Sequence, residues 1–419
     1  MIQTLSLSPG VTLRCFPDKR FKQNYLSIRF VRPTNREEVA MNALLPAVLM
    51  RGTRQLPDIR AITQHLDECF GGSASALVRR CGDIQTVGFY FTFLEDRYTL
   101  HGEPVLAPML ELLRQLLLEP ALEEGAFLKE FVEGEKKNLI STIETRRNDK
   151  RVYAADRLME ALCGEDSFAV PRLGDAKSVQ AITPQALYRH YRAILGHSPA
   201  QIFYIGSAPA ETVMERLRPV AEALATDAPM PAHMPFAAAE THAEEEEQPL
   251  QQSKLCLGFT SGIDYRSELH GAMMVLCSIY GGGMTSKLFT HVRERLSLCY
   301  YAGSVYFGSK GLMTVSAGIE DASYESARRE ILEQLEQCRR GNITERELEA
   351  GKAAVLSSLD ATPESPGSME GYYGTAFISG FDRTLEEYRA AVEAVRAEDV
   401  IRAARACRLQ AEFYLKGTA

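Results

Sequence analysis

Two short groups of residues in the 419-residue chain carry side chains that could bind a metal ion or a reacting group. His65 and Cys69 lie four residues apart on a predicted helix, with Glu68 between them, so the imidazole and the thiol share one helix face. Both groups are zinc ligands, and together they form half of a possible zinc site. A catalytic zinc needs a third protein ligand, and no other histidine lies in a motif. The alternative that we favour is a core position for Cys69 and a surface or interface position for His65.

The second group is Arg293 and Tyr300, which lie seven residues apart, or about two turns if one helix covers both. A fixed guanidinium and a phenolic O–H are donors that suit the negative charge of a tetrahedral intermediate. The alternative interpretation is structural. Arg293 would then be a surface residue paired with Glu294, and Tyr300 an ordinary strand residue.

A glycine run made of Gly281, Gly282 and Gly283 precedes this second group. No strand–G-x-G-x-x-G–helix frame surrounds it, so a phosphate cradle has little support. A tight turn that lets two stretches of backbone approach closely is the better prediction.

The elements that would position these residues indicate two domains, because 419 residues exceed one ordinary core. Residues 226–250 contain four prolines and the run Glu244–Glu247, which predicts a solvated linker rather than a cation-binding or partner-binding tail. We therefore expect domains at 1–225 and 251–419.

Both halves are predicted to have the same order of elements: a strand, two helices, two strands, further helices and a last strand. This order predicts an α+β fold of two similar domains, each a mostly antiparallel sheet with helices packed on one face. The expected strands are 25–31, 73–80, 84–94 and 201–205 in the first half, and 255–260, 299–307, 311–319 and 412–415 in the second. The expected helices are 37–51, 57–70, 101–119 and 124–147, followed by 265–280, 285–296, 322–339 and 344–360.

Composition argues against several classes of function. The chain is 45% hydrophobic and 24% charged, with a net charge of -8 and no basic stripe, so we expect no nucleic-acid partner. No apolar run reaches the length of a membrane span, and no G-x-x-x-x-G-K-[ST] motif is present. Residues 1–6 do not resemble a secretion signal, and the nine scattered cysteines suit a reducing compartment. A cytoplasmic location is therefore expected.

Four segments, 42–53, 66–72, 281–289 and 291–300, together resemble the pitrilysin/insulinase superfamily of metallopeptidases. The likeness is to the size class of mitochondrial processing peptidase subunits, and it covers nearly the whole chain. The stretch 147–154 is similar to a bacterial subgroup of that superfamily whose members lack zinc. The resemblance implies a duplicated fold and a peptide chamber.

The metal-binding positions of this superfamily are not retained. Its inverted zinc motif H-x-x-E-H falls on Ala43, Pro46 and Ala47, and alignment on Glu135 puts Thr142 at the third ligand. Methyl groups bind no metal, and a pyrrolidine ring accepts no proton from a metal-bound water. Taken alone, residues 42–53 favour the other interpretation, a buried helix that never had a site.

The resemblance therefore implies a subunit with no zinc of its own that does not hydrolyse peptides by itself. It would form a peptide-binding chamber with an active, zinc-bearing sister subunit, or a homodimer. Arg293 and Tyr300 would face the sister's zinc, and the glycine turn 281–283 would contact the peptide. Two alternatives stay open: a structural scaffold without peptide binding, and a metallopeptidase with an unrecognised site such as His65 and Cys69.

Overall fold

A computed structural model describes residues 2–234, 236, 241–381 and 383–418. The chain forms two compact units. The first comprises residues 1–144 and 170–233, and the second comprises residues 145–169 and 234–419. Each has its own sheet and its own apolar core. Among the described residues, no helix has both the length and the apolar character that a membrane crossing needs.

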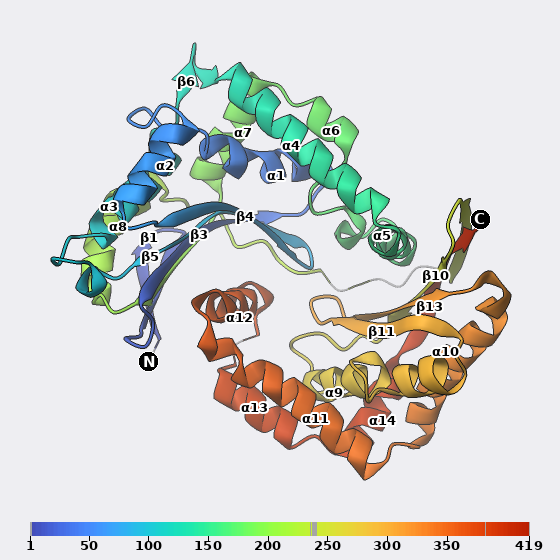
Figure 1. Ribbon diagram of the computed structural model, residues 1–419. Coiled ribbons are helices and arrows are strands. Elements are labelled where there is room, and N and C mark those ends of the chain that lie inside the picture. The colour runs from blue at the N-terminus through green and yellow to red at the C-terminus, as the bar shows by residue number, and fades with distance from the viewer. Residues whose placement is uncertain (1, 235, 237–240, 382, 419) are drawn as a thin grey trace. The chain divides into compact units, whose positions relative to one another are not determined.

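The sheet of the first unit has six strands in the order β1-β2-β8-β3-β5-β4. One face carries helices, which Figure 1 shows above the sheet. The strands are β1 Gln3–Ser8, β2 Val11–Pro17, β3 Gln23–Pro33, β4 Ser73–Cys81, β5 Ile84–Leu94 and β8 Ala200–Gly206. The helices are α1 Val39–Leu49, α2 Ile59–Glu68, α3 Leu106–Leu118, α4 Lys129–Asn148, α6 Ala176–Gln180, α7 Pro184–His197 and α8 Ala210–Ala223. A small hairpin consists of β6 Leu122–Glu123 and β7 Ala126–Phe127.

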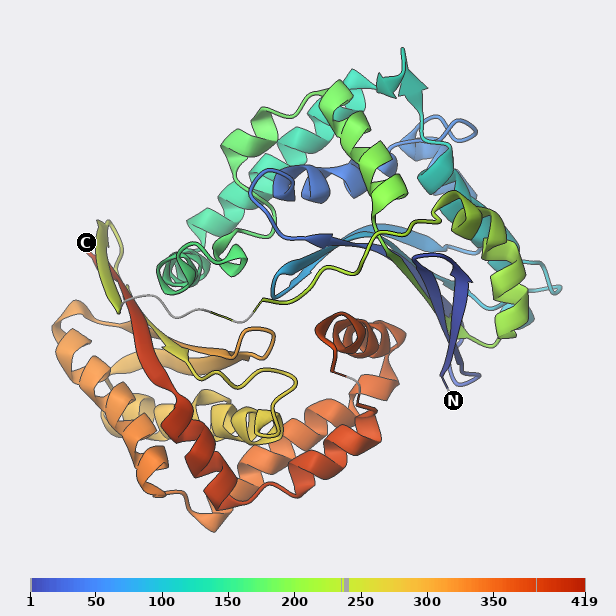
Figure 2. The same cartoon turned by 180° about the vertical axis from the view of Figure 1, so that it is seen from behind.

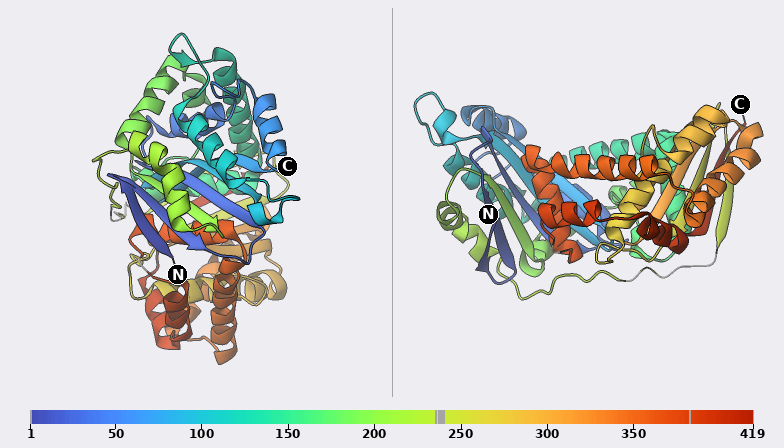
Figure 3. Two further views of the ribbon diagram at one scale, coloured as in Figure 1. Left: turned by 90° about the vertical axis from the view of Figure 1, so that its left-hand side faces the viewer. Right: turned by 90° about the horizontal axis from the view of Figure 1, so that it is seen from below.

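Strand alternation explains which face of this sheet is covered. Leu26, Ile28 and Phe30 of β3 are all buried in the helix-side core, whereas the residues between them point to the other face. At the edge, the hairpin β1-β2 lies beside α8 (Figure 3, left), and the Ser8 hydroxyl donates to the Ala221 carbonyl at 2.6 Å.

The sheet of the second unit has the order β11-β12-β10-β13-β9. Its strands are β9 His242–Gln248, β10 Ser253–Thr260, β11 Cys299–Phe307, β12 Leu312–Ile319 and β13 Arg408–Gly417. The helices of this unit are α5 Lys150–Cys163, α9 His270–Gly281, α10 Tyr324–Arg340, α11 Glu345–Asp360, α12 Pro366–Ser379, α13 Leu385–Glu393 and α14 Ala397–Ala406. A π-helical segment, η3 Leu288–Arg295, precedes β11.

The pairing of strands confirms the predicted α+β duplication. In the first unit β2 pairs parallel to β8, which is antiparallel to β3, and β3-β5 and β5-β4 are antiparallel. In the second unit β9 pairs parallel to β13, which is antiparallel to β10, and β10-β12 and β12-β11 are antiparallel. The same five-strand pattern therefore occurs twice, with β1 as an addition to the first copy.

The structure differs from the expected linker at 226–250. Residues 242–248 form β9, which Figure 2 shows beside the red strand β13. The glutamates of β9 have cationic partners on both faces: Arg157 lies 2.9 Å from Glu244, and Lys416 lies 3.1 Å from Glu247. Because these partners come from α5 and β13, the composition of residues 226–250 alone suggested a linker instead of a strand.

The expected boundary of the first domain at residue 225 also differs from the observed units, because α5 belongs to the second one. Asp149 caps this helix by accepting from the backbone N–H groups of Arg151 and Val152 at 3.0 and 3.2 Å. Leu158 and Leu162 of α5 are fully buried against Phe413 and Leu415 of β13. This apolar face explains why α5 covers the second sheet on the side opposite to α9.

Candidate functional site

Helix α1 holds the three positions at which the zinc motif would lie, and none can bind a metal. Ala43 and Pro46 are buried, and Ala47 is half-buried. Nearly every residue of α1 is apolar and buried, as expected for a core helix. Pro46 has no backbone N–H and so removes one helical hydrogen bond, that to the carbonyl of Asn42. The segment therefore has the form of the zinc helix without its chemistry.

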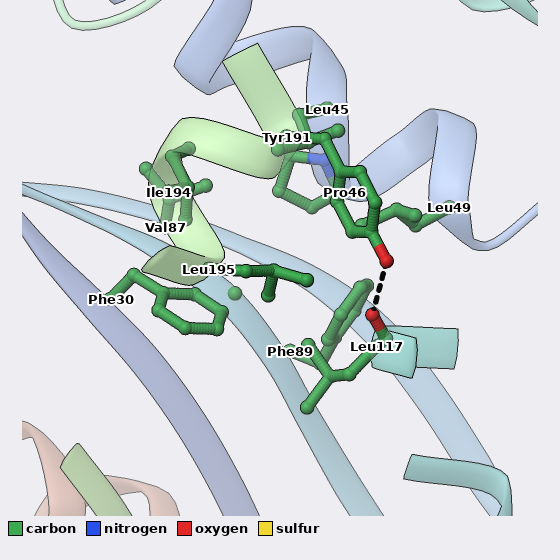
Figure 4. A pocket seen from close by; sticks show the side chains of 11 residues that line it. Phe30, Leu45, Pro46, Leu49, Val87, Phe89, Leu117, Tyr191, Ile194 and Leu195 are labelled. Carbon is green, nitrogen blue, oxygen red and sulfur yellow. Dashed lines mark hydrogen bonds between the residues drawn. The ribbon is translucent and has the colours of Figure 1, made fainter. Parts of the chain in front are cut away.

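Pro46 lines a small apolar cavity together with Leu45, Phe89, Tyr191 and Leu195 (Figure 4). The volume of about 10 Å³ holds no more than one water-sized sphere. The Tyr191 hydroxyl points away from this space and donates to the Leu117 carbonyl at 2.7 Å. Burial raises the pKa of Tyr191 well above its usual value. With no polar group directed into it, the cavity offers no acid, base or ligand.

The third ligand position also carries no metal-binding group. Thr142 is exposed on α4, and its hydroxyl donates to the Asn138 carbonyl of the same helix at 2.9 Å. Glu135, the acid seven residues earlier, forms an ion pair with Arg51 at 3.5 Å. Its carboxylate therefore neutralises a cation of the protein itself at the end of α1.

A buried polar relay next to these positions was not predicted from the sequence. Asn42 is fully buried; its amide donates to the Gln85 side chain at 2.8 Å, and its oxygen accepts from His190 at 2.7 Å. Gln85 in turn donates to the Arg172 carbonyl at 2.9 Å. The pKa of His190 is lowered to about 4, chiefly by burial; Glu38 opposes this shift and Arg32 adds to it. A neutral imidazole with its proton on Nε2 thus links α1 to α7.

The relay members are far apart in the chain and belong to no motif. No local pattern in a single sequence marks Asn42, Gln85 and His190 as neighbours. The only available signal was a polar Asn42 within an otherwise apolar helix.

The structure brings His65 and Cys69 together, with Nε2 and Sγ 3.9 Å apart. Cys69 is buried, and burial raises the pKa of its thiol. The thiolate that zinc would need is therefore disfavoured. Within the part of the chain that the structure describes, no group of three or more His, Cys, Asp or Glu side chains is placed to hold a metal ion. This pair therefore lacks the third ligand that a catalytic site requires.

Arg293 and Tyr300 do not share a helix, in line with the expected helix 285–296 and strand 299–307, so the spacing of two helical turns does not apply. The π-helix η3 ends at Arg295, and Tyr300 lies on β11 after a residue with positive φ, Ser297. Short π-helical segments are rare and are frequently found at functional sites. The bulge in the pairing of β11 with β12 falls at Cys299–Tyr301 and re-aims the side chains there.

Both side chains are exposed to a large extent: 43% of the Arg293 side chain and 59% of Tyr300. The Arg293 guanidinium lies 3.5 Å from Glu294 and 4.7 Å from the ring centre of Phe289. The Tyr300 hydroxyl donates to Glu320 at 3.2 Å, and this hydrogen bond raises the pKa of Tyr300. The pairing of Arg293 with Glu294 matches the structural alternative, and the exposure leaves both donors accessible.

The glycine run has a packing role at its first position. A Cβ on Gly281 would lie 2.5 Å from the backbone nitrogen of Ser304, so only glycine lets α9 approach β11 this closely. A Cβ on Gly282 would lie 2.6 Å from the Cα of Ser278, whereas Gly283 has open space around it. Close backbone approach, as predicted, therefore accounts for Gly281, and Gly283 has no packing constraint.

The family described as "Peptidase M16 inactive domain" matches residues 181–355, a range that contains the glycine run, Arg293 and Tyr300. The chain is 29% identical over 417 residues, 98% of its length and 96% of the relative's, to "Probable inactive metalloprotease YmfF" of Bacillus subtilis (strain 168). It is 24% identical to "Uncharacterized zinc protease YmxG" of the same organism, which covers 83% of this chain and 85% of the relative.

Among solved structures, a conserved protein from Enterococcus faecalis V583 is 27% identical, with a TM-score of 0.92 and coverage of 99% of this chain and 98% of that one. A peptidase M16 inactive domain from Pseudomonas fluorescens shares the fold, with a TM-score of 0.82 at 19% identity and coverage of 100% and 98%. The fold and the matched segment indicate an M16-like, or insulinase-like, peptidase homologue. Its similarity is to inactive M16 metalloproteases.

Proposed function

We propose that the chain is a non-catalytic subunit that forms a peptide-binding chamber with a zinc-bearing sister subunit. In this proposal Arg293 and Tyr300 act on the sister's substrate, where the guanidinium and the phenol stabilise the developing oxyanion. The chain contributes no metal. Both proteins are cytoplasmic, and a homodimer is the alternative assembly.

The observation that carries the proposal is the contrast between the two units. Ala43, Pro46 and Ala47 leave α1 without any group that could bind zinc or accept a proton. In the second unit, Arg293 and Tyr300 remain exposed on η3 and β11. These two exposed donors, whose present partners Glu294 and Glu320 belong to the same unit, would have a purpose if another chain supplied the metal.

Extended peptides would bind by strand addition to an open sheet edge. β4 is the last strand of the first sheet, after β5, and so one side of its backbone is available for a further strand. Gly283, which no packing contact constrains, would be a further point of contact with the peptide.

The test mixes the purified chain with its zinc-bearing sister and follows peptide turnover. Arg293→Ala should lower turnover by the mixture on the order of 100-fold, as for the loss of an oxyanion donor. Arg295→Ala is the matched control, because Arg295 is an exposed arginine on the same π-helix. Unchanged turnover with Arg293→Ala would remove the catalytic contact.

Two further outcomes separate the alternatives. Absence of peptide binding and of any effect on a sister would indicate a structural scaffold. Near-stoichiometric zinc in protein purified without added metal, together with peptide cleavage by this chain alone, would indicate a metallopeptidase instead.

A further inference from the structure

The side of β4 that faces away from β5 can be identified residue by residue. The hairpin β4-β5 has the two-residue turn Gly82–Asp83, so Cys81 and Ile84 form the hydrogen-bonded pair next to the turn. Hydrogen-bonded pairs then alternate along an antiparallel ladder. The backbone groups that face away from β5 are therefore those of Ala74, Ala76, Val78 and Arg80.

One of these outward groups already has a partner from the same unit. The Arg172 guanidinium donates to the Val78 carbonyl at 3.3 Å. The Arg80 side chain donates in turn to the Val170 carbonyl. The segment Val170–Gly174, which we name the edge strap, therefore lies along the second half of β4.

Two contacts anchor the edge strap to the rest of the first unit. Gln85 of the buried relay donates to the Arg172 carbonyl at 2.9 Å. Gly174 has a φ of +72° and a Cβ there would lie 2.9 Å from Ala40 of α1, so glycine allows the turn and the close packing. The turn itself closes with a hydrogen bond from the Gly174 N–H to the Pro171 carbonyl at 2.9 Å.

We infer that the edge strap is a built-in competitor for the strand-adding edge of β4. It limits an added peptide strand to Ala74 and Ala76, because Arg172 occupies the carbonyl of Val78 that a longer peptide would need. This inference rests on the proposed peptide binding at β4. The Arg172–Val78 hydrogen bond is exposed to solvent and is therefore weak enough for a backbone N–H to replace it.

A length series of probe peptides tests the competition. The probes are fluorescein-labelled, alternating Thr-Gln peptides of three, five, seven and nine residues, and a nine-residue peptide with N-methylated backbone is the control without donors. Affinity for the unaltered protein should rise from three to five residues and then level off. For Arg172→Ala, affinity should continue to rise with the longer probes, by roughly 2- to 10-fold, since each further hydrogen bond contributes about 0.5–1.5 kcal/mol.

Arg60→Ala, a change at an exposed arginine on α2, should behave as the unaltered protein does. If affinity depends on probe length in the same way for the unaltered protein and for Arg172→Ala, the edge strap does not compete with the peptide. The proposed peptide binding itself would then stand. Failure of every probe to bind either protein would overturn both the peptide-binding proposal and the inference.

Amide hydrogen exchange without any probe tests the strap separately. The Gly174 amide should exchange several-fold faster in Arg172→Ala than in the unaltered protein, because the strap loses its contact with Val78. Unchanged exchange of the Gly174 amide would show that the Arg172–Val78 hydrogen bond does not hold the edge strap in place, whatever the probes show.

Discussion

At the scale of single residues, two buried histidines contrast in how their ring nitrogens are satisfied. His190 donates to Asn42 at 2.7 Å. His270 is only 2% exposed and stacks on Tyr388 at 5.1 Å between ring centres, and none of the described residues forms a hydrogen bond with either of its ring nitrogens. The imidazole of His190 thus belongs to a polar relay, whereas the ring of His270 packs against aromatic side chains.

This contrast predicts opposite effects of the same substitution at neutral pH. His190→Phe should destabilise the protein by about 1–3 kcal/mol, because it leaves the buried oxygen of Asn42 without its donor. His270→Phe should be neutral or stabilising, since it removes two unsatisfied nitrogens from an aromatic cluster. Urea unfolding at pH 7.5 measures both, and equal losses would contradict the assignment of the relay.

The same two residues predict how stability depends on pH. Burial lowers the pKa of both His190 and His270 to about 4, against about 6.5 in an unfolded chain. A histidine with a lowered folded pKa contributes full stability above pH 6.5 and loses it as the pH falls towards 4. Each could contribute up to roughly 3 kcal/mol of this loss. Between pH 6.5 and 4 the unfolding free energy of His270→Phe should fall less than that of the unaltered protein, by up to roughly 3 kcal/mol. The same fall in both proteins would refute the contribution of His270.

At the scale of elements, the junction of α9 with β11 depends on one glycine and not on its neighbour two residues away. Gly281→Ala should cost about 1–3 kcal/mol, because the added methyl overpacks against the Ser304 backbone. Gly283→Ala should change the unfolding free energy by less than about 0.5 kcal/mol. Chemical denaturation distinguishes them, and a reduction in peptide binding by Gly283→Ala without loss of stability would support its proposed contact.

At the scale of the whole molecule, α5 belongs to the second unit and stabilises it, although residues 170–233 of the first unit separate α5 from the rest of the second unit in the sequence. Leu158→Ala should cost about 2–5 kcal/mol and raise amide exchange in β13, because it opens a cavity against the second sheet. Leu217→Ala on α8 is the matched change in the first core and should raise exchange in β8 instead. If Leu158→Ala raised exchange in the first sheet alone, the assignment of α5 would fail.

The sequence was sufficient to predict the α+β duplication, because apolar periodicity marks the longer helices and the central strands of both sheets. It missed β1, β2 and β9, of which β2 and β9 occupy the same position in the two copies. The charges of β9 are balanced by α5 and β13, and no local pattern carries that information. The placement of α5 and the relay among Asn42, Gln85 and His190 likewise depend on contacts between residues that are distant in the chain.

The candidate site was predictable where an unsuitable residue type excludes chemistry, as at Ala43, Pro46 and Ala47. It was not predictable where geometry decides. The change from helix to strand between Arg293 and Tyr300 was expected, but the π-helical form of η3 and the bulge at Cys299–Tyr301 were not. Whether the two donors act together stays a prediction for the mixture experiment.

The apolar surroundings of Pro46 also make a zinc motif difficult to build on α1 one residue at a time. A glutamate introduced there on its own would bring a negative charge against an apolar wall, with no cation present to balance it. Histidines introduced first would crowd a packed helix without binding anything. A protein engineer would therefore have to change all three positions together and repack the wall around them.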